Sequence, residues 1–107
     1  MSLDFAPVQI DFRSFNTRGA NIETRFFGEH TFNRRIRKAI AAINGFELYF
    51  TGTDHNIQNI LVGCDTIIDD ANVGTVSARI KLKFADRSFD DSVDGWVTVV
   101  IFVDVVD

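Results

Sequence analysis

This sequence is short of cysteine, of long apolar runs and of the motifs that accompany catalysis. Its single cysteine, Cys64, excludes a disulfide within the chain. No apolar run approaches the roughly 20 residues that a membrane-spanning helix needs. Residues 1–5 lack the basic region and apolar segment of a secretory signal. We therefore expect a cytoplasmic protein, with unconventional export as an alternative.

Several enzyme classes also lack their signatures here. The chain contains no Gly-x-Ser-x-Gly elbow, no P-loop, no Gly-x-Gly-x-x-Gly and no His-Glu-x-x-His pattern. Cys64 falls in phase with Ile60 and Val62, which indicates a buried small side chain and not a nucleophile. A formal net charge of −4 argues against nucleic acid, because phosphate binding needs a surplus of Lys and Arg. We expect no enzyme, no cofactor and no nucleic-acid partner.

What the chain does have is apolar material for one small core. Hydrophobic residues make up 46% of it and eleven residues are Phe, which is typical of a globular protein. Its 107 residues have room for one domain, since domains commonly contain about 100–150 residues. We predict a single domain over residues 1–107, with residues 1–6 as a loose N-terminal extension. A core this small would gain stability from association.

The clearest pattern lies in residues 94–107. The odd positions from 97 to 105 are apolar and mostly β-branched, and residues two apart share one face of a strand. The other face contains Trp96, Val100 and Phe102, although a strand with one solvated face should be polar there. Either a second layer of this domain or a second copy of the chain covers that face. We favour a second copy and predict that these three residues form a subunit interface, with core packing as the alternative.

Residues 36–52 allow more than one interpretation. Ala and Lys in residues 37–43 favour a helix. The β-branched residues there and the Asn44-Gly45 pair, which is typical of a tight hairpin or a bulge, argue against it. We predict one long bulged strand or a hairpin over residues 38–51, with a helix as the less favoured alternative.

Alternation of apolar and polar residues predicts the remaining strands. They are expected at residues 7–15, 22–27 (ending at Gly28), 30–33, 57–64 and 75–84. Residues 75–84 alternate most cleanly, and their outer face is predicted to be solvated and basic. The sum is an all-β, single-domain antiparallel β-sandwich of about six or seven strands.

The polar loop Asp54-His55-Asn56 is the best candidate for ligand binding. Loops on a rigid sheet commonly provide recognition residues, and carboxylate, amide and imidazole groups can hydrogen-bond sugar hydroxyls. The alternative is that Asp54 only caps a turn.

Two further clusters of charge have a metal or an interface interpretation. The acidic residues Asp86, Asp90, Asp91 and Asp94 could gather Ca²⁺, but they match no EF-hand spacing. His30, His55 and Cys64 are scattered, so we expect no metal site. Basic residues cluster in residues 33–38 and acidic ones in residues 65–70 and 86–94. These patches are either solvated faces or surfaces that meet across a subunit interface.

One order of segments resembles a known family. Ala39-Ile-Ala-Ala-Ile-Asn-Gly-Phe-Glu-Leu48 precedes the Asp54-His55-Asn56 loop, and Val76-Ser-Ala-Arg-Ile80, an acidic loop and Gly95-Trp96-Val97 follow. This order, over residues 32–105, resembles the H-type lectin domain of snail agglutinins and discoidin C-terminal domains. The family tends to have an Arg in the first loop and prolines before the long strand, where this chain has Asp54-His55-Asn56 and Arg37-Lys38.

The resemblance implies a six-stranded sandwich that trimerises and binds galactose or N-acetylgalactosamine at subunit clefts. It also implies sugar contacts from the final loop, where Asp86 and Arg87 are the nearest equivalents. We therefore carry two hypotheses. The first is a carbohydrate-binding module that uses Asp54, His55, Asn56, Asp86 and Arg87. The second is a structural assembly domain, such as a virion, tail or scaffold subunit, that forms a trimer without a small ligand.

Overall fold

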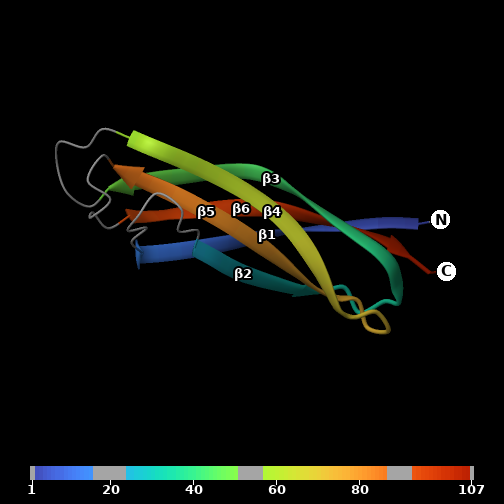
Figure 1. Cartoon of the computed structure of the whole chain (residues 1–107). Coiled ribbons are helices and arrows are strands. Elements are labelled where there is room, and N and C mark those ends of the chain that lie inside the picture. Colours follow the sequence, from blue (N-terminus) through green and yellow to red (C-terminus); the bar gives the residue numbers. More distant parts are fainter. Residues whose placement is uncertain (1, 16–23, 51–56, 87–92, 107) are drawn as a thin grey trace.

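The computed structural model describes residues 2–15, 24–50, 57–86 and 93–106, and these residues form strands and no helix. The six strands are β1 (Ser2–Phe15), β2 (Thr24–Thr31), β3 (Ile36–Phe50), β4 (Ile57–Asp70), β5 (Thr75–Asp86) and β6 (Val93–Val105). They make two antiparallel three-stranded sheets, in the orders β1-β6-β3 and β2-β5-β4 (Figure 1). The predicted all-β sandwich of six or seven strands is confirmed.

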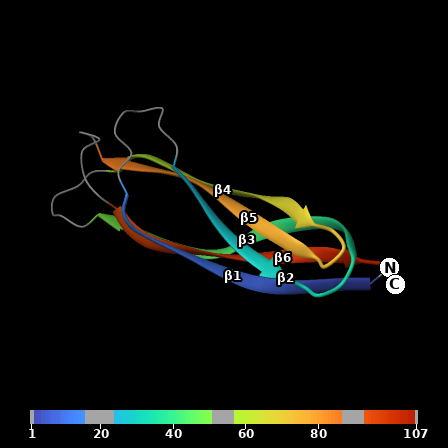
Figure 2. The ribbon, with the colours of Figure 1, turned by 90° about the horizontal axis from the view of Figure 1, so that it is seen from below.

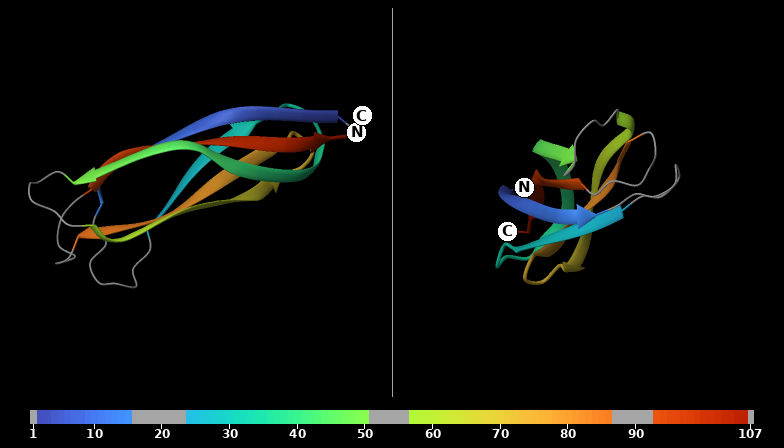
Figure 3. Two further views of the ribbon diagram at one scale, coloured as in Figure 1. Left: turned by 90° about the horizontal axis from the view of Figure 1, so that it is seen from above. Right: turned by 90° about the vertical axis from the view of Figure 1, so that its left-hand side faces the viewer.

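The two sheets pack face to face along the length of the molecule (Figure 2). β1 lies over β2, β6 lies over β5 and β3 lies over β4, so each sheet has its central strand in the middle of the core. Both chain termini lie at the same end of the sandwich (Figure 3). Among the described residues, no helical segment has the length and apolar character needed to cross a membrane.

The core lies between the two central strands. In β6 the odd positions from Val97 to Val105 are at most 1% exposed, as their alternation predicts. In β5 the even positions from Val76 to Leu82 are fully buried. Both central strands have a neighbour on each side, so their inward side chains are enclosed from every direction.

β3 is one long bulged strand, so the predicted bulged strand is confirmed and the helix alternative is wrong. The register against β6 shifts between Ile43 and Gly45, at the Asn44-Gly45 pair. A second shift between Ile36 and Lys38 sets both Arg37 and Lys38 opposite Asp104. Pairing with the apolar strand β6 outweighs the modest helix propensity of the Ala-rich segment.

Several boundaries predicted from the sequence are wrong. The strand predicted at residues 57–64 continues to Asp70, and residues 30–33 are not a separate strand. Residues 2–6 are not a loose extension, because Ser2 to Ala6 belong to β1 and pair with Val105 to Ile101 of β6. Nor does a strand end at Gly28, since β2 continues through it to Thr31. A Cβ on Gly28 would lie 2.6 Å from Val8 Cγ1 and 2.8 Å from Ile10 Cγ1, so glycine here allows β2 to pack closely on β1.

The end of the sandwich near the termini is closed by hydrogen bonds between two connections. The Phe32 amide donates to the Gly74 carbonyl at 2.9 Å, and the Ile36 amide donates to the Ala71 carbonyl at 2.9 Å. Asn33 and Gly74 supply the positive φ angles, 59° and 72°, that these turns require. The β2–β3 crossover is thereby tied to the β4–β5 hairpin.

The close packing around β6 generates a stability prediction. A Cβ on Gly95 would collide with the Glu47 carbonyl oxygen and lie 3.0 Å from Phe12 Cε2, whereas a Cβ on Gly63 meets nothing within 4 Å. We expect Gly95→Ala to lower the free energy of unfolding by about 1–3 kcal/mol through overpacking. Gly63→Ala, the matched control, should change it by less than about 0.5 kcal/mol. Denaturant unfolding of the two variants measures the difference, and equal midpoints would contradict this account.

Candidate functional site

Four of the five predicted ligand-binding residues lie outside the described residues. Asp54, His55, Asn56 and Arg87 belong to this group, and so do Asp90 and Asp91 of the calcium alternative. The backbone of Asp86 ends β5 and pairs with Ile57, the residue that follows Asn56 in the chain. The end of β3, the start of β4, the end of β5 and the start of β6 all lie at the end of the sandwich away from the termini (Figure 1).

The three predicted interface residues lie on the outer face of the β1-β6-β3 sheet. Trp96, Val100 and Phe102 alternate with the buried odd positions of β6, and they are half-buried or exposed. No other described strand covers this face, because the β2-β5-β4 sheet packs against the opposite one. They are therefore not core residues of this chain.

Neighbouring strands extend the apolar surface around them. Phe5 of β1 and Ile40 of β3 pair with Phe102 on either side, and Leu3 lies beside Asp104. Leu3 is 73% exposed, Phe5 65% and Ile40 67%. The Phe5 and Phe102 rings lie 6.2 Å apart between centroids, at a distance typical of a packed aromatic pair. We call this surface the outer apolar face; it consists of Leu3, Phe5, Pro7, Ile40, Ala42, Val100 and Phe102.

Sequence reasoning missed the part of this face that β1 and β3 contribute. The sequence predicts a loose extension at Leu3 and Phe5, although apolar residues alternate with polar ones there. Ile40 lies in the segment that allows more than one interpretation. Only the register with β6 shows which face each residue shares.

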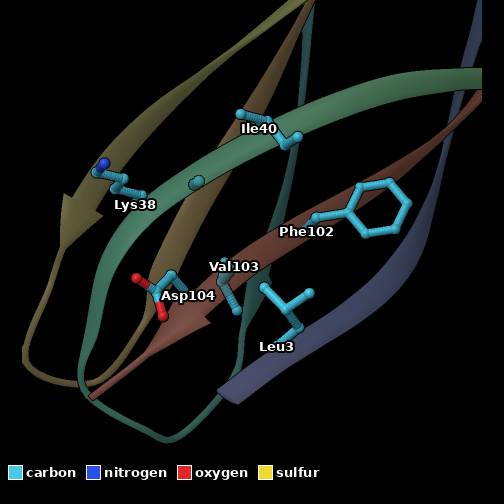
Figure 4. A pocket seen from close by; sticks show the side chains of 7 residues that line it. Leu3, Lys38, Ile40, Phe102, Val103 and Asp104 are labelled. Atoms are coloured by element: carbon cyan, nitrogen blue, oxygen red, sulfur yellow. The ribbon is translucent and has the colours of Figure 1, made fainter. Parts of the chain in front are cut away.

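A hollow of about 280 Å³ opens on this face. Figure 4 shows side chains from three strands around it, with Leu3 on β1, Ile40 on β3 and Phe102 on β6. Lys38 and Asp104 complete its border, together with Ala39 and Val103. A small, open and mostly apolar hollow suits an inserted side chain better than an enclosed small molecule.

Asp104 sits at the border of the hollow with an incomplete set of partners. Arg37 Nε lies 3.4 Å from Asp104 Oδ2. Asp104 Oδ1 is buried and has no hydrogen-bond partner among the described residues. A buried acceptor without a donor costs free energy, and this oxygen is not exposed to the hollow, whose lining surface is apolar.

The outer face of the other sheet differs in character. Arg79 and Asp65 form a two-pronged ion pair, with Arg79 Nε donating to Asp65 Oδ1 at 2.9 Å, and this hydrogen bond raises the pKa of Arg79. Ser77 donates to Asp69 Oδ2 at 2.6 Å. Exposed apolar side chains occur there too, but they stand among polar ones: Phe27 pairs with Arg79 in the register. This outer face is basic, as the sequence predicts, and its Arg79 is paired with Asp65 within the sheet.

The remaining candidates for chemistry have structural roles. Cys64 points into the sandwich, where its thiol lies 3.6 Å from the Ala41 carbonyl, and Thr66 Oγ1 donates to the Ala39 carbonyl at 3.0 Å. Both contacts satisfy the free edge of β3. His30 packs edge-on against Phe32, with ring centroids 4.6 Å apart. In the described part of the chain no three His, Cys, Asp or Glu side chains gather as metal ligands would.

Comparison with family models, with curated proteins and with solved structures gives no significant match to this chain.

The environment of Cys64 predicts low thiol reactivity. Burial raises the pKa of this thiol, and the Asp65 charge adds to the effect. A raised pKa lowers the thiolate fraction at a given pH, and the thiolate is the form that reacts. We expect the alkylation rate of the folded chain by iodoacetamide to be several-fold below that of the unfolded chain. Its pH profile should also shift to higher pH. The same protein in concentrated guanidinium chloride is the control, since it contains no other cysteine; equal rates would contradict the prediction.

Proposed function

We propose that this chain is a non-catalytic assembly module that associates with further copies of itself through the outer apolar face. The observation that carries this proposal is the exposure of Leu3, Phe5 and Ile40 beside Phe102, on a sheet whose other face is the core. A contiguous apolar patch of this kind marks an interaction surface, whereas single exposed apolar residues need no explanation.

The contrast between the two sheets supports the proposal. The β2-β5-β4 sheet faces solvent with ion pairs and hydroxyl hydrogen bonds, such as Arg79 with Asp65 and Thr31 with Thr75. The β1-β6-β3 sheet carries Trp96 and two Phe on its outer face, and aromatic residues are enriched at interface centres. Burial of these side chains would stabilise an oligomer. The family resemblance implies three copies, but association through this face does not require that number.

The outer apolar face predicts that one charged substitution dissociates the oligomer. Phe5→Asp places a carboxylate in the middle of the face, and we expect it to raise the dissociation constant by more than about thirtyfold, as for an aromatic anchor. Phe27→Asp is the matched control, because Phe27 is 59% exposed, also lies on an edge strand, and belongs to the other sheet. Sedimentation over a dilution series measures association. The emission of Trp96, the only tryptophan, should shift to longer wavelength as copies separate.

Circular dichroism and thermal unfolding show whether both variants keep their fold. A wild-type chain that stays monomeric throughout the dilution series would overturn the proposal. Equal effects of Phe5→Asp and Phe27→Asp would remove this face as the interface.

Carbohydrate binding is the second candidate function, and one observation favours it. Asp86 pairs with Ile57, so the last residue of β5 neighbours the segment that ends at Asn56. Two polar segments that the resemblance implies as sugar contacts are therefore connected in the chain to the same pair of strands, β4 and β5. Loops at one end of a rigid sandwich are common recognition surfaces.

A glycan array tests this second candidate. We expect binding to terminal galactose-type sugars by the wild type, and loss of that binding in Asp54→Ala. The substitution should change the unfolding free energy by no more than about 1 kcal/mol, if Asp54 acts in binding and not in the fold. Undiminished binding by the variant would exclude the loop, and a wild type that binds no glycan would leave assembly as the function.

A further inference from the structure

The outer face of the β1-β6-β3 sheet has opposite charges at its two ends. Toward the start of β6, Asp11 and Glu47 flank Trp96 in register, and Asp94 lies two residues earlier on the same face. Toward the end of β6, Arg37 and Lys38 of the bulge lie opposite Asp104. Three carboxylates thus stand at one end, and two cations with one carboxylate at the other.

These two ends cannot neutralise each other within one chain. Eight residues separate Trp96 from Asp104 along β6, which is about 26 Å at about 3.3 Å per residue. That distance exceeds the Debye length of about 8 Å at physiological ionic strength. Lys38 and Glu47 are exposed, and neither side chain makes an ion pair with another described residue.

Between the charged ends lies the outer apolar face, so the surface is acidic, then apolar, then basic along the strands. Two copies can stack such faces about a two-fold axis that runs along the strands or across them. An axis along the strands places like ends together. An axis across the strands exchanges the ends and places the basic end of each copy over the acidic end of the other.

We propose that a second copy of this chain packs on the outer apolar face in antiparallel orientation, about a two-fold axis that crosses β6 near Val100. This inference rests on the proposed self-association and specifies its geometry. The axis lies over the midpoint of Trp96 and Asp104, and it sets β3 of one copy over β3 of the other. Lys38 of each copy then lies near Glu47 of the other, twice by symmetry. Complementary charges fix the register, and the apolar centre supplies most of the affinity.

The size of the face fits a dimer. Three strands about 4.8 Å apart and roughly 13 residues long form a surface of roughly 14 by 43 Å. Its flat area is on the order of 600 Å², and protruding side chains add to it. A standard interface buries about 800 Å² on each partner. Face-to-face sheets also pack well when their strands are nearly aligned, at about 30°.

In the same arrangement, a side chain of the second copy fills the hollow on this face. The Trp96 ring covers Gly45, where a Cβ would lie 3.7 Å from it, so the ring stands on the surface near the acidic end. Exchange of the ends brings this ring over the partner's hollow, which Lys38, Ile40 and Asp104 help to line (Figure 4). An aromatic ring suits this hollow, because apolar side chains such as Leu3 and Phe102 form most of its lining.

Charge reversal tests the orientation. In the antiparallel dimer, Lys38→Glu places a second carboxylate against Glu47 of the other copy at both symmetric contacts, and Glu47→Lys brings two cations together in the same way. We expect each single variant to raise the dissociation constant about tenfold at low ionic strength. The double variant Lys38→Glu/Glu47→Lys should return to within about threefold of the wild type, because it restores opposite charges. Sedimentation equilibrium measures all four proteins, and thermal unfolding confirms that each is folded.

The outcomes separate this inference from the proposed function. A wild-type dimer with weakened single variants and a restored double variant supports the antiparallel arrangement. About an axis along the strands, β3 would lie over β1 of the other copy, so Lys38 and Glu47 would not meet. Additive effects of the two substitutions, or no effect of either, would therefore overturn the orientation while leaving self-association in place. A wild-type trimer would do the same. A wild type that is monomeric at every concentration would overturn both.

Discussion

Strand β6 imposes the constraint on which the rest of the structure depends, because it is apolar on both faces and central in its sheet. Its inward side chains from Val97 to Val105 are fully enclosed by the second sheet. Burial of five such side chains contributes on the order of 10 kcal/mol, at about 1.5–3 kcal/mol each, which is comparable to the net stability of a whole domain. The chain has no third layer among its described residues, so no described strand covers the outer face of β6.

The other sheet shows how this chain builds a face that is suited to water. Its central strand β5 has fully buried residues on one side and residues that form hydrogen bonds or an ion pair on the other, such as Ser77 and Arg79. The free edge of β3 is also satisfied, because Thr66 and Cys64 of β4 contact its carbonyl groups. Two sheets of one small domain thus differ in what their outer faces are suited to contact. Packing within the chain alone does not explain why one outer face is polar and the other apolar.

Side-chain alternation predicted most of the fold, because period two directly encodes a strand with one buried face. It predicted the buried face of β6, and the Asn44-Gly45 pair predicted the bulge in β3. It failed at Gly28, where glycine allows two sheets to approach and does not end a strand. It also failed at Leu3 and Phe5, whose partners lie about 100 residues away in sequence, so no local pattern could pair them.

The sequence predicted only the β6 part of the candidate interface, because side-chain alternation acts along a single strand. Trp96 and Phe102 belong to the strand with the clearest pattern, and their exposure follows from alternation along that one strand. The complementary charges, by contrast, come from three strands. Lys38 faces outward only because a bulge shifts the register of β3, and Glu47 and Asp11 reach one level only through pairing with β6. Only the pairing of the strands shows which charged residues lie at the same level of the sheet, and the sequence of one strand does not show it.

The orientation of the copies also determines what the two candidate functions could achieve together. The ends of β3 and β5 that adjoin the predicted sugar-binding segments lie away from the chain termini (Figure 1). An antiparallel dimer would place these ends on opposite sides of the assembly, about one sandwich length apart. A single glycan-bearing surface could then engage only one of them, so avidity on that surface would be lost and two separate surfaces would be linked. A parallel trimer would present all its ends to one surface. The charge order along the outer face of the β1-β6-β3 sheet would therefore affect the proposed sugar recognition as well as the proposed assembly.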